Sequence, residues 1–253
     1  MPAGAATTLA SRGLFTVRGR PVRLRAAPRL GEVSSAQLAN LPRLPDTADE
    51  VRDIALVMNA DLTRDVFTGR QASEGRVKSM TLAGYKVLAF ATHGLVPGDL
   101  DGLNQPALAL SSPKLVGGED DGLLTMSEIL TLKLDADWVV LSACNTASGN
   151  GAGAEAVSGL GRAFFYAGTR ALLVSNWPVE TTSARALTTN IFGRQAKDAS
   201  LSRADALRQS MLSLIDGPGF KDGQGNIVFS YAHPIFWAPF SLVGDGGGGK
   251  PAG

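Results

Sequence analysis

Three short apolar runs constrain the fold of this chain more than any other feature of the sequence. They cover Tyr85–Thr92, Asp137–Ala143 and Arg170–Ser175. Nearly continuous apolar runs of this length are typical of strands that are buried on both faces, as in a parallel sheet. Segments with helical patterns separate the runs. We therefore expect an α/β domain of three α/β/α layers, with a mostly parallel sheet and helices on both of its faces.

Capping boxes predict where two of the helices begin. Thr47–Glu50 and Thr125–Glu128 each have a hydroxyl residue followed by a glutamate three positions later. The remaining patterns predict helices over Gln71–Leu82, Ala154–Ala167, Thr181–Lys197 and Ser202–Ile215, short strands over Arg64–Thr68 and Pro106–Leu110, and a last apolar segment over Pro234–Val243.

Composition excludes several classes of function. The 253 residues include 24 basic and 23 acidic side chains, and this balance argues against binding nucleic acid through bulk charge. The chain has one cysteine, Cys144, and two histidines, His93 and His233, so it has no cysteine-rich metal site and no internal disulfide. We expect no cofactor and no metal. Calcium on the Asp-rich loops near 99–101 or 119–121 is the one metal alternative, and those loops are more simply solvated turns.

The two ends of the chain differ in composition from its middle. Residues 1–31 carry six arginines and no acid, and residues 246–253 are rich in glycine. We expect residues 1–40 to be a poorly structured arm, residues 41–245 to form the folded domain, and residues 246–253 to be a flexible tail. No apolar run approaches 18 residues and no secretory signal is evident, so we expect a cytoplasmic protein that does not associate with membranes.

Reactive side chains follow two of the buried runs. His93 comes directly after the first run, and Cys144 comes directly after the second. Because the carboxyl ends of parallel strands meet at one edge of a sheet, the imidazole and the thiol are predicted to lie near each other. A thiolate is a nucleophile that a neighbouring histidine can assist, and the N–H of Gly94 is a candidate oxyanion donor. We interpret His233, which precedes Pro234, as structural.

Five sequence blocks resemble a known family. They are Phe90–Gly94, Leu141–Ala147, Gly159–Ala167, Leu173–Val179 and His233–Phe240. Together they resemble the CHAT family of caspase-like domains, which are commonly found at the C-terminal end of tetratricopeptide-repeat proteins, mostly in bacteria. The separation of 51 positions between His93 and Cys144 is also close to the caspase value of about 50. The sequence around Cys144, Ser-Ala-Cys-Asn-Thr, nevertheless departs from the caspase signature.

This resemblance implies a caspase-like fold over residues 41–245 and cysteine endopeptidase activity on a protein or peptide substrate. It places the catalytic histidine on His93 and the nucleophile on Cys144, and it implies a role in bacterial signalling or defence with a tetratricopeptide-repeat partner or region. The chain departs from the family in two respects. It has no helical repeats upstream, and the strand that normally precedes Leu44-Pro45 is weak.

The same resemblance places Ser175 and Trp177 beside the substrate. The alternative is a buried strand end with a tryptophan in the core. Asp99, Asp101 and Glu180 are candidates to bind a basic substrate side chain, and Arg162 is a candidate to bind an acidic one. A preference for an apolar substrate side chain is a third alternative that stays open.

Two other functions compete with a protease. Gly151, Gly153 and Ala156 follow a strand and precede a helix, as in a dinucleotide-binding oxidoreductase. However, these glycines lie several residues past the strand, and the next strand ends in Ser175-Asn176, where an acidic residue that binds ribose would be expected. The other alternative is a catalytically silent scaffold that retains both His93 and Cys144.

Overall fold

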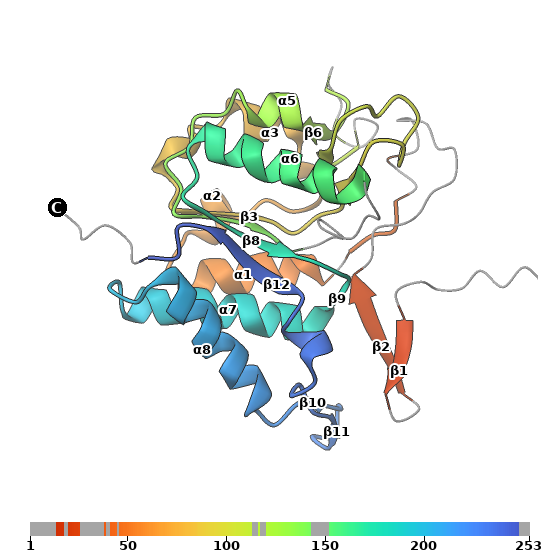
Figure 1. Ribbon diagram of the computed structural model, residues 1–253, viewed down its shortest axis with the longest axis vertical. Coiled ribbons are helices and arrows are strands. Elements are labelled where there is room, and N and C mark those ends of the chain that lie inside the picture. Colours follow the sequence, from red (N-terminus) through yellow and green to blue (C-terminus); the bar gives the residue numbers. More distant parts are fainter. Residues whose placement is uncertain are drawn as a thin grey trace, which may run out of the picture.

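A four-stranded sheet with the strand order β12, β8, β7, β3 forms the centre of the computed structural model (Figure 1). Its strands are β3 (Val87–Phe90), β7 (Trp138–Leu141), β8 (Ala171–Ser175) and β12 (Phe240–Gly244). β3, β7 and β8 are parallel, and β12 is antiparallel to β8. The three apolar runs thus form the three parallel strands, which confirms the predicted sheet. The structure describes residues 14–17, 20–25, 38, 41–44, 46–112, 116, 120–142 and 152–247.

Helices cover both faces of this sheet, because alternate residues of the buried strands point to opposite sides. Val140 and Leu173 join one apolar cluster with α1, α7 and α8, while Val139 and Leu172 join another with α6. Figure 1 shows these two layers on opposite sides of the sheet. The described helices are α1 (Thr47–Val57), α2 (Leu62–Asp65), α3 (Glu74–Ser79), α5 (Met126–Ile129), α6 (Ala152–Ala167), α7 (Thr181–Lys197) and α8 (Arg203–Ile215). The three-layer prediction is confirmed.

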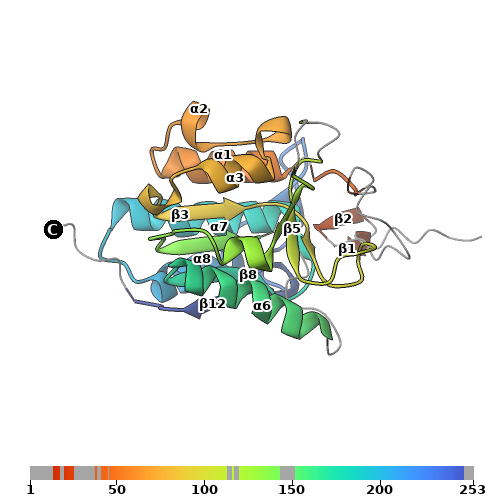
Figure 2. The same ribbon diagram turned by 90° about the horizontal axis from the view of Figure 1, so that it is seen from above.

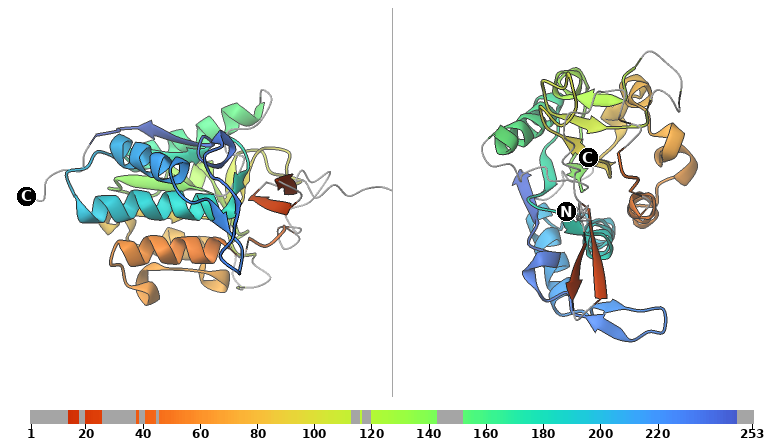
Figure 3. Two further views of the ribbon diagram at one scale, coloured as in Figure 1. Left: turned by 90° about the horizontal axis from the view of Figure 1, so that it is seen from below. Right: turned by 90° about the vertical axis from the view of Figure 1, so that its right-hand side faces the viewer.

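Within the described residues, three smaller sheets surround this centre. β4, β5 and β6 form an antiparallel sheet next to the carboxyl end of β3, and the hairpin of β1 and β2 extends away from the central sheet and pairs with β9 (Figure 3). β10 pairs with β11. These strands are β1 (Leu14–Val17), β2 (Arg20–Arg25), β4 (Gly94–Leu95), β5 (Ala107–Ala109), β6 (Leu123–Thr125), β9 (Val179–Glu180), β10 (Phe220–Lys221) and β11 (Ile227–Phe229).

Local signals predicted some of these elements and missed others. The capping box of Thr125 and Glu128 is present at the start of α5. At α1, however, Asp46 precedes the helix without a capping hydrogen bond, and the Thr47 hydroxyl donates to the Leu44 carbonyl instead. The strand predicted over Arg64–Thr68 is wrong, because α2 occupies its first part and the rest pairs with no strand of the described residues. The helix predicted over Gln71–Leu82 is shortened to α3.

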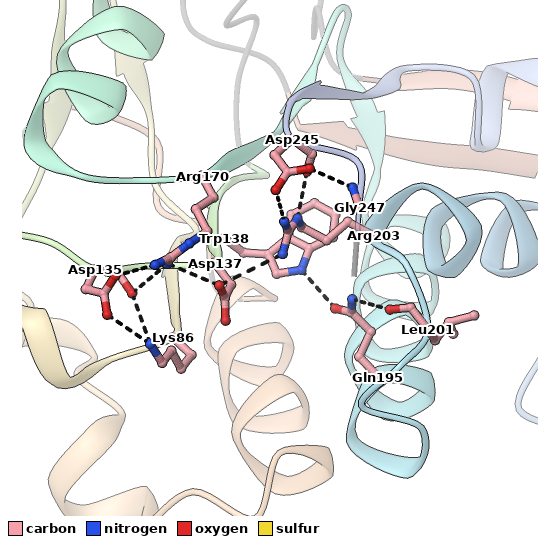
Figure 4. Close-up of polar contacts among 10 residues, drawn as sticks. All are labelled: Lys86, Asp135, Asp137, Trp138, Arg170, Gln195, Leu201, Arg203, Asp245 and Gly247. Carbon is pink, nitrogen blue, oxygen red and sulfur yellow. Dashed lines mark hydrogen bonds and ion pairs between the residues drawn. The ribbon is translucent and has the colours of Figure 1, made fainter. Parts of the chain in front are cut away.

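A polar network ties together the amino ends of the parallel strands (Figure 4). Arg170 precedes β8 and donates to Asp137, which precedes β7, at a distance of 3.1 Å. Arg170 also donates to Asp135. Arg203, at the start of α8, is 1% exposed and donates to the Asp245 carbonyl oxygen at 2.6 Å, just after β12. These contacts hold the sheet at the end opposite His93. None of the helices in the described segments is long and apolar enough to cross a membrane.

Candidate active site

His93 lies just beyond the carboxyl end of β3, next to the sheet of β4, β5 and β6. Its backbone carbonyl accepts a hydrogen bond from the Ala109 N–H at 2.8 Å, and the hydroxyl of neighbouring Thr92 donates to the Ala109 carbonyl. The His93 side chain is only 5% exposed. The histidine is therefore anchored through its own backbone by β5, and its ring is held inside the protein.

The imidazole of His93 has a defined tautomer. Nε2 lies 2.8 Å from the carbonyl oxygen of Pro42. Because a carbonyl oxygen can only accept, Nε2 carries the proton and Nδ1 carries the lone pair. Nδ1 is buried and has no hydrogen-bond partner among the residues that the structure describes. The ring thus presents a proton acceptor on the side opposite Pro42.

The environment of His93 favours the neutral ring. Burial lowers the pKa of the His93 imidazole below its usual value, and the hydrogen bond to the Pro42 carbonyl opposes this effect without cancelling it. Sequence patterns identified His93 but missed Pro42. A backbone carbonyl has no residue type of its own, so no local pattern marks it in advance.

The register of β3 and β7 relates His93 to the position of Cys144 in the chain. Phe90 pairs with Leu141 at the ends of these parallel strands. His93 is the third residue after Phe90, and Cys144 is the third residue after Leu141. Cys144 itself lies outside the described residues, as does Gly151, whereas Gly153 lies in α6. The relation between His93 and Cys144 therefore rests on their equal offsets from the paired strand ends, and not on an interatomic distance.

Gly94 is the first residue of β4, and its backbone orientation follows from the ladder. Its neighbour His93 is bonded to Ala109, and Gly94 pairs with Leu108. Antiparallel ladders alternate between bonded and non-bonded pairs, so the N–H of Gly94 points away from β5. Gly94 is buried and has interactions of its own.

Comparison with known proteins identifies the family. The family model of the CHAT domain matches residues 5–245. The chain belongs to the CHAT domain family. It is also 34% identical over 122 residues to tetratricopeptide repeat protein 28 of Mus musculus, a match that covers 48% of this chain and 4% of that protein. The chain thus corresponds to a small part of this much longer relative. The family match also includes β1 and β2, which lie in the segment expected to be an arm.

Ser175 is the last residue of β8 and Trp177 follows that strand, at the same edge of the CHAT domain as His93. Ser175 is fully buried and pairs with Phe240 of β12, whereas the Trp177 side chain is 37% exposed. Between them, the Asn176 amide donates to the Pro239 carbonyl and to the Ser241 hydroxyl. These hydrogen bonds hold the backbone that precedes Trp177. Of Ser175 and Trp177, only Trp177 has a large accessible surface.

The four charged side chains considered for substrate binding have different surroundings. The Glu180 carboxylate is buried and caps α7 by accepting from the N–H groups of Thr182 and Ser183. Asp99 accepts from the N–H of Val96, and burial raises the pKa of its carboxyl. Asp101 and Arg162 are exposed. Glu180 is therefore committed to a structural role. Within the described segments, no group of three or more His, Cys, Asp or Glu side chains could hold a metal ion.

Proposed function

We propose that this CHAT domain is a cysteine endopeptidase in which Cys144 is the nucleophile and His93 is its proton acceptor and donor. The equal offset of both residues from the paired Phe90 and Leu141 carries this proposal. In parallel strands, equal offsets bring two positions to the same level of the same sheet edge. The neutral ring of His93, with its lone pair on Nδ1, is the form that can accept a proton from a thiol.

In the proposed reaction, the Cys144 sulfur attacks the carbonyl carbon of a peptide bond while the thiol proton moves to His93 Nδ1. The Pro42 carbonyl stabilises the imidazolium through the hydrogen bond to Nε2. The proton then passes from Nδ1 to the leaving amine as the carbon–nitrogen bond breaks, and a thioester remains on Cys144. Water attacks the thioester, His93 accepts a proton from this water, and the acid product leaves as that proton returns to the sulfur.

The residues proposed to bind the substrate are at the same edge of the central sheet as His93. The N–H of Gly94 is proposed to donate to the oxyanion, supported by its direction away from β5. Trp177 is proposed to contact a substrate side chain because a large part of its ring is accessible, and Ser175 to support the backbone of that segment. A tetratricopeptide-repeat region is the proposed partner, and the name of the mouse relative supports it.

Proteome-wide mapping of new N-termini tests the proposed activity. A cell lysate is incubated with the wild-type chain, with Cys144→Ala and with His93→Ala. We expect new N-termini with the wild type, none with Cys144→Ala, and a loss of about 10²–10⁴ in rate with His93→Ala. Equal cleavage by wild type and Cys144→Ala would overturn the proposal.

Thiol alkylation provides a second test that needs no substrate. Because Cys144 is the only cysteine in the chain, the rate of reaction with iodoacetamide reports on this thiol alone. We expect the rate at pH 6 to fall in His93→Ala, while the fully unfolded forms of both proteins react equally. If the folded wild type and variant react equally and no new N-termini form, the catalytically silent scaffold is the better description.

A further inference from the structure

One ammonium group joins acidic side chains from three segments of the chain. Lys78 Nζ of α3 lies 2.8 Å from Glu74, 2.7 Å from Asp120 and 3.1 Å from Glu128. Glu74 belongs to α3 itself, Asp120 to the segment before β6, and Glu128 to α5. Figure 1 shows α3, α5 and β6 grouped together on one side of the central sheet. We refer to these four residues as the Lys78 cluster.

Glu74 is the buried member of the Lys78 cluster. Its side chain is 2% exposed, whereas the other three side chains are between 30% and 39% exposed. Both oxygens of the Glu74 carboxyl group have partners, because Oε1 accepts from Lys78 and Oε2 accepts from the N–H of Gly122, each at 2.8 Å. A hydrogen bond is stronger in buried surroundings than at a surface that water screens. Glu74 therefore fixes the backbone of Gly122 to α3.

Backbone hydrogen bonds continue from Gly122 to His93. The Gly122 carbonyl accepts from the N–H of Leu110 at 2.8 Å, and Ala109, the residue before Leu110, donates its N–H to the His93 carbonyl at 2.8 Å. Figure 2 shows β5, which ends at Ala109, beyond the arrowhead of β3. Three hydrogen bonds and one step along β5 thus connect the Glu74 carboxyl group to the backbone of His93.

The charges of the Lys78 cluster do not balance when all of its groups are ionised, because one ammonium faces three carboxylates. Burial raises the pKa of Glu74 to about 7, and the Glu128 carboxyl group acts in the same direction, although the hydrogen bonds from Lys78 and Gly122 oppose both. A proton on Glu74 therefore removes repulsion between α3 and α5. The other charged groups around Glu74 are Asp120 of the cluster and two side chains that line the same small cavity, Arg70 and Arg76.

We propose that Glu74 is a positioning residue for the proposed proteolysis, and that it holds His93 in reach of Cys144 through the backbone of Gly122 and β5. This inference rests on the proposed function of His93. The Glu74 carboxyl group fixes Gly122, Gly122 fixes the end of β5, and β5 fixes the backbone that carries the imidazole. Because a proton on Glu74 removes the repulsion from Glu128, the protonated form holds this link more firmly than the ionised form.

NMR titration of the His93 imidazole tests the link without a substrate. The Hε1 chemical shift of the wild type is expected to show two inflections, one below pH 6.5 from the ring itself and one near pH 7 from Glu74. Glu74→Gln cannot titrate at this position, so we expect it to keep the first inflection and to lose the second. A single inflection in the wild type, or the same second inflection in Glu74→Gln, would contradict the proposal.

Alkylation of Cys144 tests whether the link reaches the nucleophile. Glu74→Met keeps a long side chain but removes the acceptor for the Gly122 N–H, whereas Glu74→Gln keeps an acceptor oxygen. We expect the rate of reaction with iodoacetamide at pH 6 to fall about threefold to tenfold in Glu74→Met and to stay within about twofold of the wild type in Glu74→Gln. Equal rates in the wild type and in folded Glu74→Met would overturn the proposal. If Glu74→Met does not fold, the NMR comparison of the wild type with Glu74→Gln decides.

Lys78→Met separates positioning from stability. It removes three ion pairs and leaves the Gly122 N–H bonded to Glu74. We expect a lower urea midpoint and a rate of alkylation within about twofold of the wild type. An equal fall in rate in Lys78→Met and Glu74→Met would show that only the stability of the fold matters, and the positioning role would be wrong.

Mapping of new N-termini distinguishes this inference from the proposed function. If the wild type forms no new N-termini while Glu74→Met still lowers the rate of alkylation, the endopeptidase function fails and the positioning of His93 by Glu74 stands. If the wild type and folded Glu74→Met form new N-termini at the same rate, the endopeptidase function stands and the positioning role fails.

Discussion

The ring of His93 links a backbone contact to the protonation state of a side chain. Burial of the ring favours its neutral form, although the hydrogen bond that Nε2 donates to Pro42 acts in the opposite direction. The proposed reaction needs this neutral ring as a proton acceptor. The depressed pKa therefore predicts how the activity depends on pH.

We predict that kcat/KM rises with pH along an acidic limb whose midpoint lies below the usual histidine pKa of about 6.5. The burial that lowers the pKa of His93 keeps the ring neutral, and thus competent, at pH values where an exposed histidine is already protonated. NMR titration of the imidazole protons measures the same pKa without a substrate, and His93→Gln identifies the signal. A midpoint above 6.5 in both measurements would contradict the assignment.

Two backbone segments approach each other so closely at position 168 that only glycine fits there. Gly168 has a φ of +113°, and a Cβ atom built on it would lie 2.2 Å from the carbonyl oxygen of Leu134. The contact arises because the N–H of Leu134 donates to the Ala167 carbonyl at 2.7 Å, at the end of α6.

We predict that Gly168→Ala lowers the free energy of unfolding by about 2–4 kcal/mol, because both the positive φ and the clash oppose a side chain. Urea unfolding measures the loss. Gly84→Ala is the matched control, since a Cβ there meets no atom within 4 Å. Equal stabilities of the two variants would refute this role of Gly168.

Among the elements, those with strong internal patterns were predictable from the sequence. The apolar runs became β3, β7 and β8, and α7 matches its predicted bounds. Val66–Thr68 was not predictable, because an extended segment becomes a strand only when another strand pairs with it. At the site, His93 was identified from its place after an apolar run. Its contact with Pro42 depends on a loop 51 positions earlier, and no local pattern carries that information.

The short helix α3 is fastened by a buried carboxyl group. Glu74 is 2% exposed, and it accepts from the Gly122 N–H and from Lys78, both at 2.8 Å. Burial raises the pKa of Glu74 to about 7, although both hydrogen bonds act in the opposite direction. The native state therefore holds a proton at Glu74 over a pH range in which the unfolded chain has released it.

We predict that the contribution of Glu74 to stability falls as the pH rises from about 4.5 to about 7 and then stays constant. The sign follows from linkage, because in this window the native state binds more protons than the unfolded state. Glu74→Gln, which cannot titrate, is expected to gain stability relative to the wild type as the pH rises. Urea midpoints of both proteins at pH 5, 6, 7 and 8 measure the difference. A difference that does not change with pH would contradict the raised pKa.

At the scale of the whole molecule, the two ends of the parallel strands have different roles. The amino ends are held by the network of Arg170, Asp137, Arg203 and Asp245 (Figure 4). The carboxyl ends lead into His93 and into the segment that contains Cys144. Stability and proposed chemistry are thus separated along the length of the sheet. A substitution in the network should lower the stability of the fold and leave the reactivity of Cys144 unchanged.

Arg203→Met tests this separation, because methionine keeps an apolar stem but loses every donor. The Arg203 side chain is 1% exposed, its Nε donates to the Asp245 carbonyl at 2.6 Å, and its Nη2 donates to the Asp245 carboxylate. We predict a loss of about 2–3 kcal/mol in the free energy of unfolding from the lost buried hydrogen bonds.

Arg208→Met is the control on the same helix. Arg208 is 64% exposed and pairs with Asp205 at 3.3 Å at the surface, so its loss should leave the urea midpoint unchanged. Below their unfolding transitions, both variants should react with iodoacetamide at the wild-type rate, because Arg203 lies at the sheet end opposite His93. A change in that rate in folded Arg203→Met would show that the two ends of the sheet are coupled. A stable Arg203→Met would show instead that the hydrogen bonds of Arg203 contribute little to folding.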